Sequence, residues 1–293
     1  MNSTTYSILV PIGFSEQSLI ALEQAERLAV LTKGEITLLS VIETSGMLTR
    51  LFGEDDAQYK ELKSNLQVKL DKLAAEVSAR IGLKVNAMAS KGKVSQKIIE
   101  ASELISAKLI IMGTNGTPSE FSKKVIGSNA FRVVTHSTCP VITIKGQDHF
   151  KGCRSIILPL DLEKETKEKV SHALKLARLW GATVRVVSIS NNKDEDAKLK
   201  LKANLNQVKK FLSDGGVSTE AEIINSEGKT LAQTIINYSS ANNGDLIMIM
   251  TQQESDFTNH FIGSSAQSII YNSDTPIMSI RPQINIRTIY DLP

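Results

Sequence analysis

Short apolar runs alternate with longer amphipathic segments along the whole chain. Residues 7–11 are apolar at nearly every position, which is typical of a strand buried on both faces of a parallel sheet. Ser15 then offers an N-cap for a helix over residues 16–32, whose leucines recur at helical spacing, and Gly34 is expected to end that helix. The same reasoning predicts further strands at 36–42, 85–90, 109–112 and 141–144, and helices at 59–81, 95–105 and 127–137.

The order of elements repeats in the second half of the chain. The run 156–161 matches 8–13, and the run 245–249 matches 108–112. In each half a Gly-Ser pair follows the later run, and a proline stands thirteen residues after its glycine. The pairs are Gly127-Ser128 and Gly263-Ser264, and the prolines are Pro140 and Pro276. Landmarks in one order at matched spacing indicate a tandem repeat. The alternative is one large α/β domain with coincidental strand ends.

Alternating strands and helices predict an α/β fold of two tandem doubly wound domains, each a parallel sheet with helices on both faces. We expect a first domain over residues 1–148, a second over 149–282 and a C-terminal tail over 283–293. The first half is longer than the second, and much of the excess falls in the polar segment 44–59. The sequence does not decide between a lid and a contact surface as the role of this segment.

Composition narrows the function classes. Of 293 residues, 41% are hydrophobic and 22% charged, which fits a folded globular chain. The net charge of only +3 and the 5% aromatic content argue against nucleic acid as a partner. Apolar runs are strand-sized and no leader pattern precedes residue 7, so we expect no membrane span and a cytoplasmic protein. Two cysteines, Cys139 and Cys153, cannot form a disulfide framework.

The strongest candidate site follows the strand at 109–112. Gly113 and Gly116 begin and end the segment 113–116. After a spacer of ten residues, a second glycine-containing segment, 127–129, begins a helix. Glycines let backbone N–H groups approach an anion, and a helix start adds unpaired N–H groups. The hydroxyls of Thr114 and Ser128 and the amide of Asn115 would complete a phosphate site. The alternative is an ordinary pair of glycine turns.

The two glycine groups resemble the Gly-x2-Gly-x9-Gly-[Ser/Thr] motif of the universal stress protein family, and the strands at Pro11 and Pro140 look like its first and last. These similarities span residues 6–145, and a weaker copy follows, so the chain resembles a tandem member. The resemblance implies five parallel strands per half and ATP binding, with adenine near the first two strands and phosphates on the glycine loop. The nucleotide-binding residues are then expected to be Pro11, Ile12, Gly13, Val41, Met112, Gly113, Thr114, Asn115, Gly116, Gly127, Ser128 and Asn129.

Two departures weaken this expectation in the first half. The spacer before Gly127 has ten residues where the family has nine. Gly13 stands where the family usually has an aspartate near the ribose and any phosphate-bound metal.

The second half keeps the spacing but not the glycines. Asp161 occupies the aspartate position, whereas Met250 and Gln253 stand where the loop glycines belong, followed by Gly263 and Ser264 in register. We expect this second site to be degenerate and not to bind ATP.

Two functions from different classes remain open. The first is a stress-response binding or switch protein that holds ATP or AMP, with or without Mg²⁺, in its first domain. We see no residue placed as a general base, so binding is favoured over catalysis, and weak ATP hydrolysis is the most that we expect. The second is a scaffold for protein–protein interaction that binds no nucleotide. The resemblance to tandem family members implies that its halves would then pair through their last strands as a pseudo-dimer. A further homodimer or a separate protein partner stays open in both.

Overall fold

The computed structural model describes residues 5–43, 56–114, 126–145, 152–160, 166–190, 195–251 and 262–282. The first half contains β1 (Ser7–Pro11), α1 (Glu16–Thr32), β2 (Glu35–Glu43), α3 (Asp56–Ile81), β3 (Val85–Gly92), α4 (Val94–Leu104), β4 (Leu109–Gly113), α5 (Ser128–His136) and β5 (Val141–Ile144). The second half contains β6 (Ser155–Leu160), α6 (Thr166–Trp180), β7 (Thr183–Ser190), α7 (Glu195–Asp214), β8 (Thr219–Asn225), α8 (Leu231–Ala241), β9 (Leu246–Met250), α9 (Ser264–Asn272) and β10 (Ile277–Ile280).

The predicted repeat is confirmed in the strand order. All ten strands form one sheet in the order β3-β2-β1-β4-β5-β10-β9-β6-β7-β8, so the second half repeats the first in reverse. The same backbone bond recurs in both halves, from Lys108 N to Ser7 O at 2.8 Å and from Asp245 N to Ser155 O at 2.9 Å. Each half is therefore a five-stranded parallel α/β unit. The expected boundary at residue 148 lies outside the described residues.

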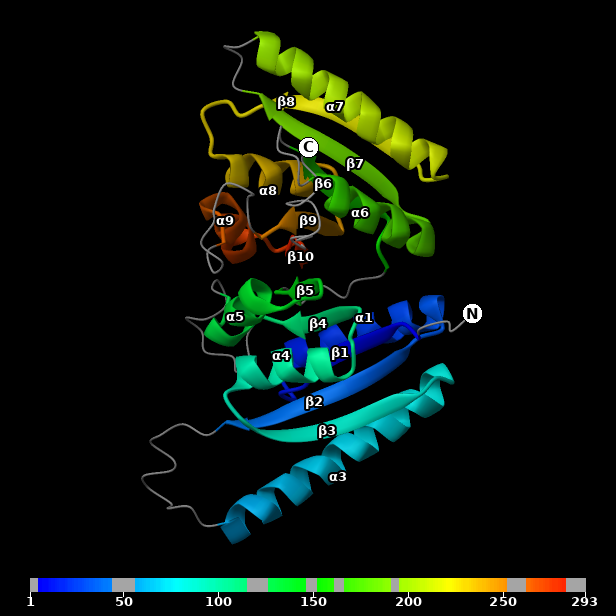
Figure 1. The fold of residues 1–293 in the computed structure, drawn as a ribbon, viewed down its shortest axis with the longest axis vertical. Helices are drawn as coiled ribbons and strands as arrows, with labels where there is room; N and C mark the ends of the chain where they lie inside the picture. Colours follow the sequence, from blue (N-terminus) through cyan, green and yellow to red (C-terminus); the bar gives the residue numbers. More distant parts are fainter. Residues whose placement is uncertain are drawn as a thin grey trace, which may run out of the picture.

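The two halves meet at a single antiparallel pair of strands. Within each half the ladders are parallel, but β10 runs antiparallel to β5, with Met278 opposite Ile142. Figure 1 shows these two strands side by side at the centre of an elongated molecule. We call this pair the seam. It makes the chain an intramolecular pseudo-dimer.

The sheet and both hydrophobic cores are continuous across the seam. One buried cluster lies beneath α1, α3, α6 and α7, and a second lies beneath α4, α5, α8 and α9. Ile142 and Met278 belong to the first cluster, while Val141 and Ile277 belong to the second. Successive residues of a strand point to opposite faces, so both faces of the sheet are covered by helices across the seam.

Helix α1 begins as the sequence predicts and ends differently. The Ser15 hydroxyl accepts a bond from Ser18 N at 3.3 Å, which is an N-cap. At the other end Lys33, not Gly34, adopts the left-handed conformation, with φ of 50°. A Cβ on Gly34 would lie 2.2 Å from Tyr6 O, so this glycine is required for close approach of the chain to β1.

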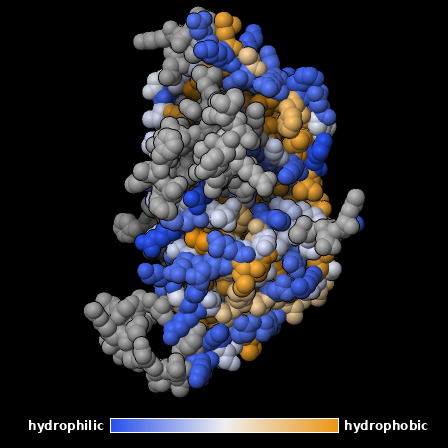
Figure 2. Space-filling view, viewed as in Figure 1, coloured by the Kyte–Doolittle hydropathy of each residue, from blue (hydrophilic) through white to orange (hydrophobic). Residues whose placement is uncertain are grey.

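Other helix boundaries shift by a few residues. Helix α3 begins at Asp56, three residues before the predicted start, and α7 extends two residues at each end beyond the range 197–212 that its sequence pattern predicts. Charged and polar residues cover much of the face seen in Figure 2, with hydrophobic residues interspersed among them. Among the described helices, none combines the length and apolarity that crossing a membrane requires.

Candidate functional site

The predicted site residues lie along one edge of the first half-sheet. Strand β1 pairs with β2 on one side and with β4 on the other, so the strand order reverses between β1 and β4. Pro11 ends β1 and Gly113 ends β4, which brings residues 11–13 and 112–114 to neighbouring positions at the carboxyl edge. Open α/β sheets bind ligands at such a reversal point.

The start of α5 closes against the end of β4. Thr114 N donates to Ile144 O at 3.0 Å, and Gly127 N donates to Thr114 O at 2.8 Å. Gly127 is the N-cap residue of α5 and makes no side-chain cap, while Ser128 beside it is exposed. The first N–H groups of a helix have no partner within the helix, so this arrangement suits an anion. We call Gly113, Thr114 and residues 127–129 the cradle.

Two predicted contact residues, Ile12 and Met112, can offer little but their backbone. The side chains of Ile12 and Met112 are buried in the two cores, and Val41 packs against the second core. The backbone N–H of Ile12 is itself engaged, donating to Leu39 O at 2.7 Å. Gly13 is exposed, and a Cβ there would meet no atom within 4 Å. This part of the edge therefore offers a ligand backbone groups and the open surface around Gly13.

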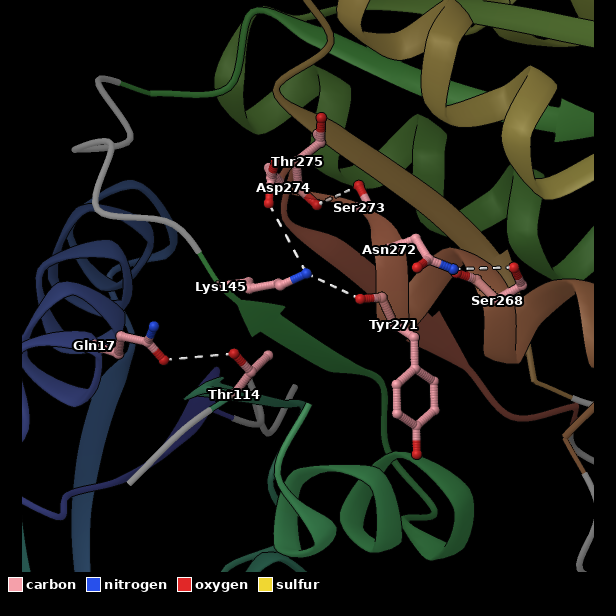
Figure 3. Close-up of polar contacts among 9 residues, drawn as sticks. All are labelled: Gln17, Thr114, Lys145, Ser268, Tyr271, Asn272, Ser273, Asp274 and Thr275. Carbon is pink, nitrogen blue, oxygen red and sulfur yellow. Dashed lines mark hydrogen bonds and ion pairs between the residues drawn. The ribbon is translucent and has the colours of Figure 1, made fainter. Parts of the chain in front are cut away.

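Gln17 is a site residue that sequence reasoning missed. A Cβ on Gly113 would lie 2.9 Å from Gln17 Cβ and 3.1 Å from Gln17 O, so the glycine lets α1 pack directly on β4. The Thr114 hydroxyl is buried and lies 3.4 Å from Gln17 Oε1 (Figure 3). Gly113 thus has a packing role besides its predicted role in binding. The contact joins residues almost a hundred positions apart, and no local pattern signals it.

Four predicted site residues have no structural account. Asn115, Gly116, Asp161 and Gln253 lie outside the described residues.

The second half reproduces the hydrogen bonds of the cradle but has Met250 in place of Gly113. Thr251 N donates to Ile280 O at 2.9 Å, and Gly263 N donates to Thr251 O at 3.3 Å. Met250, at the position of Gly113, is half-buried and packs against the first core. Ser264, at the position of Ser128, is exposed.

A lysine of the chain itself occupies the carboxyl end of β6. Lys169 is buried, and its ammonium donates to Pro159 O at 2.6 Å. Pro159 is the equivalent of Pro11 in the repeat, and Lys169 is the equivalent of Ala21 on α1. The second half therefore has a lysine at this strand end where the first half has an alanine. The two halves therefore differ in side chains at matched positions while their backbones agree.

Lys145 connects the cradle to the other half. It follows Ile144, which accepts the bond from Thr114 N, and its ammonium donates to Tyr271 O at 2.9 Å in the last turn of α9. The ammonium also lies 3.9 Å from Asp274 Oδ1 (Figure 3). The equivalent residue, Arg281, donates to His136 O at 3.3 Å at the end of α5. Each half thus places a cation on the carbonyl end of the other half's last helix.

Cys139 does not have the environment of a nucleophile. Burial raises the pKa of its thiol, and hydrogen bonds from Ser137 and the backbone only partly oppose this. The thiolate is the reactive form, so a raised pKa disfavours it. Among the described residues, no three His, Cys, Asp or Glu side chains are grouped in a way that could hold a metal ion.

The fold and this edge define a class of protein: a tandem pair of α/β domains joined through their last strands, with a glycine-containing site at a strand-order reversal. The sequence profile of the universal stress protein family matches residues 5–145 and again 152–281, and the chain belongs to that family. The resemblance expected from the glycine motif is thereby confirmed.

Individual relatives agree with this assignment. A universal stress protein of Mycolicibacterium smegmatis is 22% identical over 305 aligned residues, covering 96% of this chain and 99% of the relative. One from Methanocaldococcus jannaschii is 28% identical over 139 residues, covering 47% of this chain and 81% of the relative. The crystal structure of a universal stress protein from Archaeoglobus fulgidus superposes with a TM-score of 0.78 at 21% identity, covering 97% of this chain and all of that one. The last likeness shows the shared fold.

Proposed function

We propose that the first domain binds ATP or AMP at the cradle and that the protein acts as a stress-response binding or switch protein. The observation that carries this proposal is the closure of α5 on β4 through Gly127 N and Thr114 O, at 2.8 Å, beside a strand end where Gly113 has no side chain and the second half has Met250. That contact places an uncapped helix start beside the end of a central strand. Membership of a family in which many members bind ATP supports the nucleotide as ligand.

The chemistry of the cradle favours binding over turnover. The N–H groups at the start of α5 and the hydroxyl of Ser128 can bind phosphate oxygens without activating water, whereas the N–H groups of Thr114 and Gly127 already donate to Ile144 O and Thr114 O. Gly13 has no side chain to ligate a metal, so any Mg²⁺ would be held by the nucleotide's own phosphates. The second domain, with Lys169 at its strand end and Met250 at the glycine position, is proposed to support the first and to bind no nucleotide.

Ser128→Glu tests this proposal without disturbing the fold. A carboxylate in the first turn of α5 stabilises the helix by about 0.3–1 kcal/mol but repels phosphate. We expect ATP affinity, measured by isothermal titration calorimetry with and without Mg²⁺, to fall at least tenfold. Ser264→Glu is the matched control, because it makes the same change at the equivalent exposed position of α9, and it should leave affinity unchanged.

The scaffold function is the second candidate, and one observation favours it. The contact between Gly113 and Gln17 gives the first loop glycine a purely structural reason to be glycine. If the wild-type chain binds neither ATP nor AMP at millimolar concentration, the nucleotide proposal fails and the scaffold stands. Equal losses in Ser128→Glu and Ser264→Glu would move binding away from the cradle.

A further inference from the structure

A cavity of about 830 Å³ lies over the seam, on the face covered by α1 and α6. Its floor includes Ile111, Ile142 and Ile144, which belong to the first core, and Leu31 and Trp180 stand on its helical walls. Pockets of about 300–1,000 Å³ with mainly apolar linings are typical of small-molecule sites. The described lining shares no residue with the cradle, so this is a separate site.

Positive charge predominates around this seam cavity. Arg27, Arg80 and Arg154 line it, against Glu23 and Glu26. Arg80 is committed to Glu26 by two bonds, from Nε at 2.9 Å and from Nη2 at 2.6 Å. Arg80 is thus the ion-pair partner of the buried Glu26, and the hydrogen bonds between them raise the pKa of Arg80.

The other two arginines remain available to a ligand. Arg27 on α1 and Arg154 before β6 are both exposed, and neither guanidinium has an ion-pair partner within the described parts of the chain. A guanidinium binds carboxylate through two parallel N–H groups and is less strongly hydrated than an ammonium. The site therefore combines an apolar floor with two arginines at its exposed side.

The seam itself argues against a peptide as the occupant. Extended peptides bind by adding a strand to a free sheet edge, but β5 and β10 already use their neighbouring edges on each other. What remains is an apolar hollow with positive charge at its opening. An occupant with one apolar chain and one anionic end satisfies both features.

We propose that the seam cavity binds a free fatty acid, with its chain over Ile142 and Ile144 and its carboxylate at Arg27 and Arg154. The chain displaces water from the apolar floor, and the carboxylate stays at the opening where the arginines are exposed. This site does not depend on nucleotide binding in the cradle.

Trp180 provides a direct test. It is the only tryptophan in the chain and lines the cavity, so intrinsic tryptophan fluorescence reports on this site alone. Titration of the full chain with dodecanoate below its micelle concentration should give a saturable change at one ligand per chain. The methyl ester, which keeps the chain but loses the charge, should bind at least tenfold more weakly. Saturating ATP should not displace dodecanoate.

Three variants assign the contacts. Arg27→Gln and Arg154→Gln should each weaken dodecanoate binding about tenfold, whereas Lys175→Gln, on the exposed side of α6 and outside the described lining, should leave it unchanged. Leu31→Glu, at a half-exposed position of the wall, should abolish binding while circular dichroism shows an intact fold.

Any of three results would overturn the proposal. One is the absence of any saturable signal up to millimolar dodecanoate in the folded wild-type chain. The second is equal affinity for the acid and its methyl ester. The third is equal losses in Lys175→Gln and the arginine variants, and either of these last two would reduce the effect to nonspecific apolar adsorption.

Discussion

The glycines of the first half differ in what a side chain would meet. At Gly113 the space for a Cβ is filled by Gln17 of α1, with both its side chain and its backbone at 3.1 Å or less. At Gly13 that space is empty, and the backbone is not in the left-handed region. One glycine is therefore fixed by packing, and the other is free to be replaced.

This difference predicts opposite effects of the same substitution. Gly113→Ala forces α1 away from β4 and should cost about 1–3 kcal/mol, as overpacking does. Gly13→Ala removes freedom from the unfolded chain and should change stability by less than about 1 kcal/mol, in the stabilising direction. Differential scanning calorimetry of the two variants checks this, and equal melting temperatures would contradict the assigned contact.

His172 on α6 should make stability depend on pH. Burial is the main cause that lowers the pKa of this half-buried side chain, and the charge of Lys175 adds to it. Below the unfolded value of about 6.5 the unfolded chain binds a proton that the folded chain binds less readily. The stability contributed by neutral His172 is thus present above pH 6.5 and lost as the pH falls toward the folded pKa.

His172→Gln should remove that part of the loss. We expect the melting temperature of wild type to fall more than that of His172→Gln between pH 7.5 and pH 5.5. Parallel pH profiles for the two proteins would show that the ring carries no such linkage.

At the scale of elements, the last helix of each half is capped by the opposite half. Lys145 reaches the end of α9 from a position only 8% exposed, whereas the half-buried Arg281 reaches the end of α5 through a hydrogen bond that is exposed to solvent. Phe131 of α5 and Tyr271 of α9 also approach across the seam, with ring centroids 5.6 Å apart. These contacts join α5 and α9, the last helices of the two halves, across the seam.

The two caps should differ in strength. A hydrogen bond to a charged group contributes about 1.5–3 kcal/mol when it is buried, and an exposed one contributes less. Lys145→Ala should therefore lower the melting temperature clearly, and Arg281→Ala only slightly. A larger effect of Arg281→Ala in calorimetry would reverse the ranking of the two contacts.

Most elements could be predicted from the sequence because their patterns are local. A strand covered on both faces appears as a short apolar run, as in Leu246–Met250. The N-cap residue Ser15 marks the start of α1 in the same local way. The end of α1 was less predictable, because Gly34 is required by its close approach to Tyr6, just before β1, and not by the end of the helix. Contacts of that kind depend on tertiary packing.

For the whole molecule, the sequence predicts the duplication but not what the halves build between them. The matched spacing of Gly-Ser pairs and prolines indicates two copies, and the last strands were expected to pair. The seam cavity, however, takes residues from both halves, and its arginines carry no motif. The candidate site at the glycine loop could be predicted because its residue types are specific, whereas the contacts of Gln17 and Lys145 could be identified only once the elements were placed.

The two halves that meet at the antiparallel seam belong to one chain, and this covalent linkage fixes their ratio. A homodimer of identical domains would carry two equal nucleotide sites and would separate on dilution, whereas covalent linkage makes the association intramolecular at any concentration. The copy that supplies β10 has diverged at Met250 and Lys169 without breaking the joint, so each molecule holds a fixed ratio of one intact cradle to one altered partner. A ligand that binds the cradle would then occupy one site per chain. Its binding curve would show no cooperativity between two equal sites within the chain.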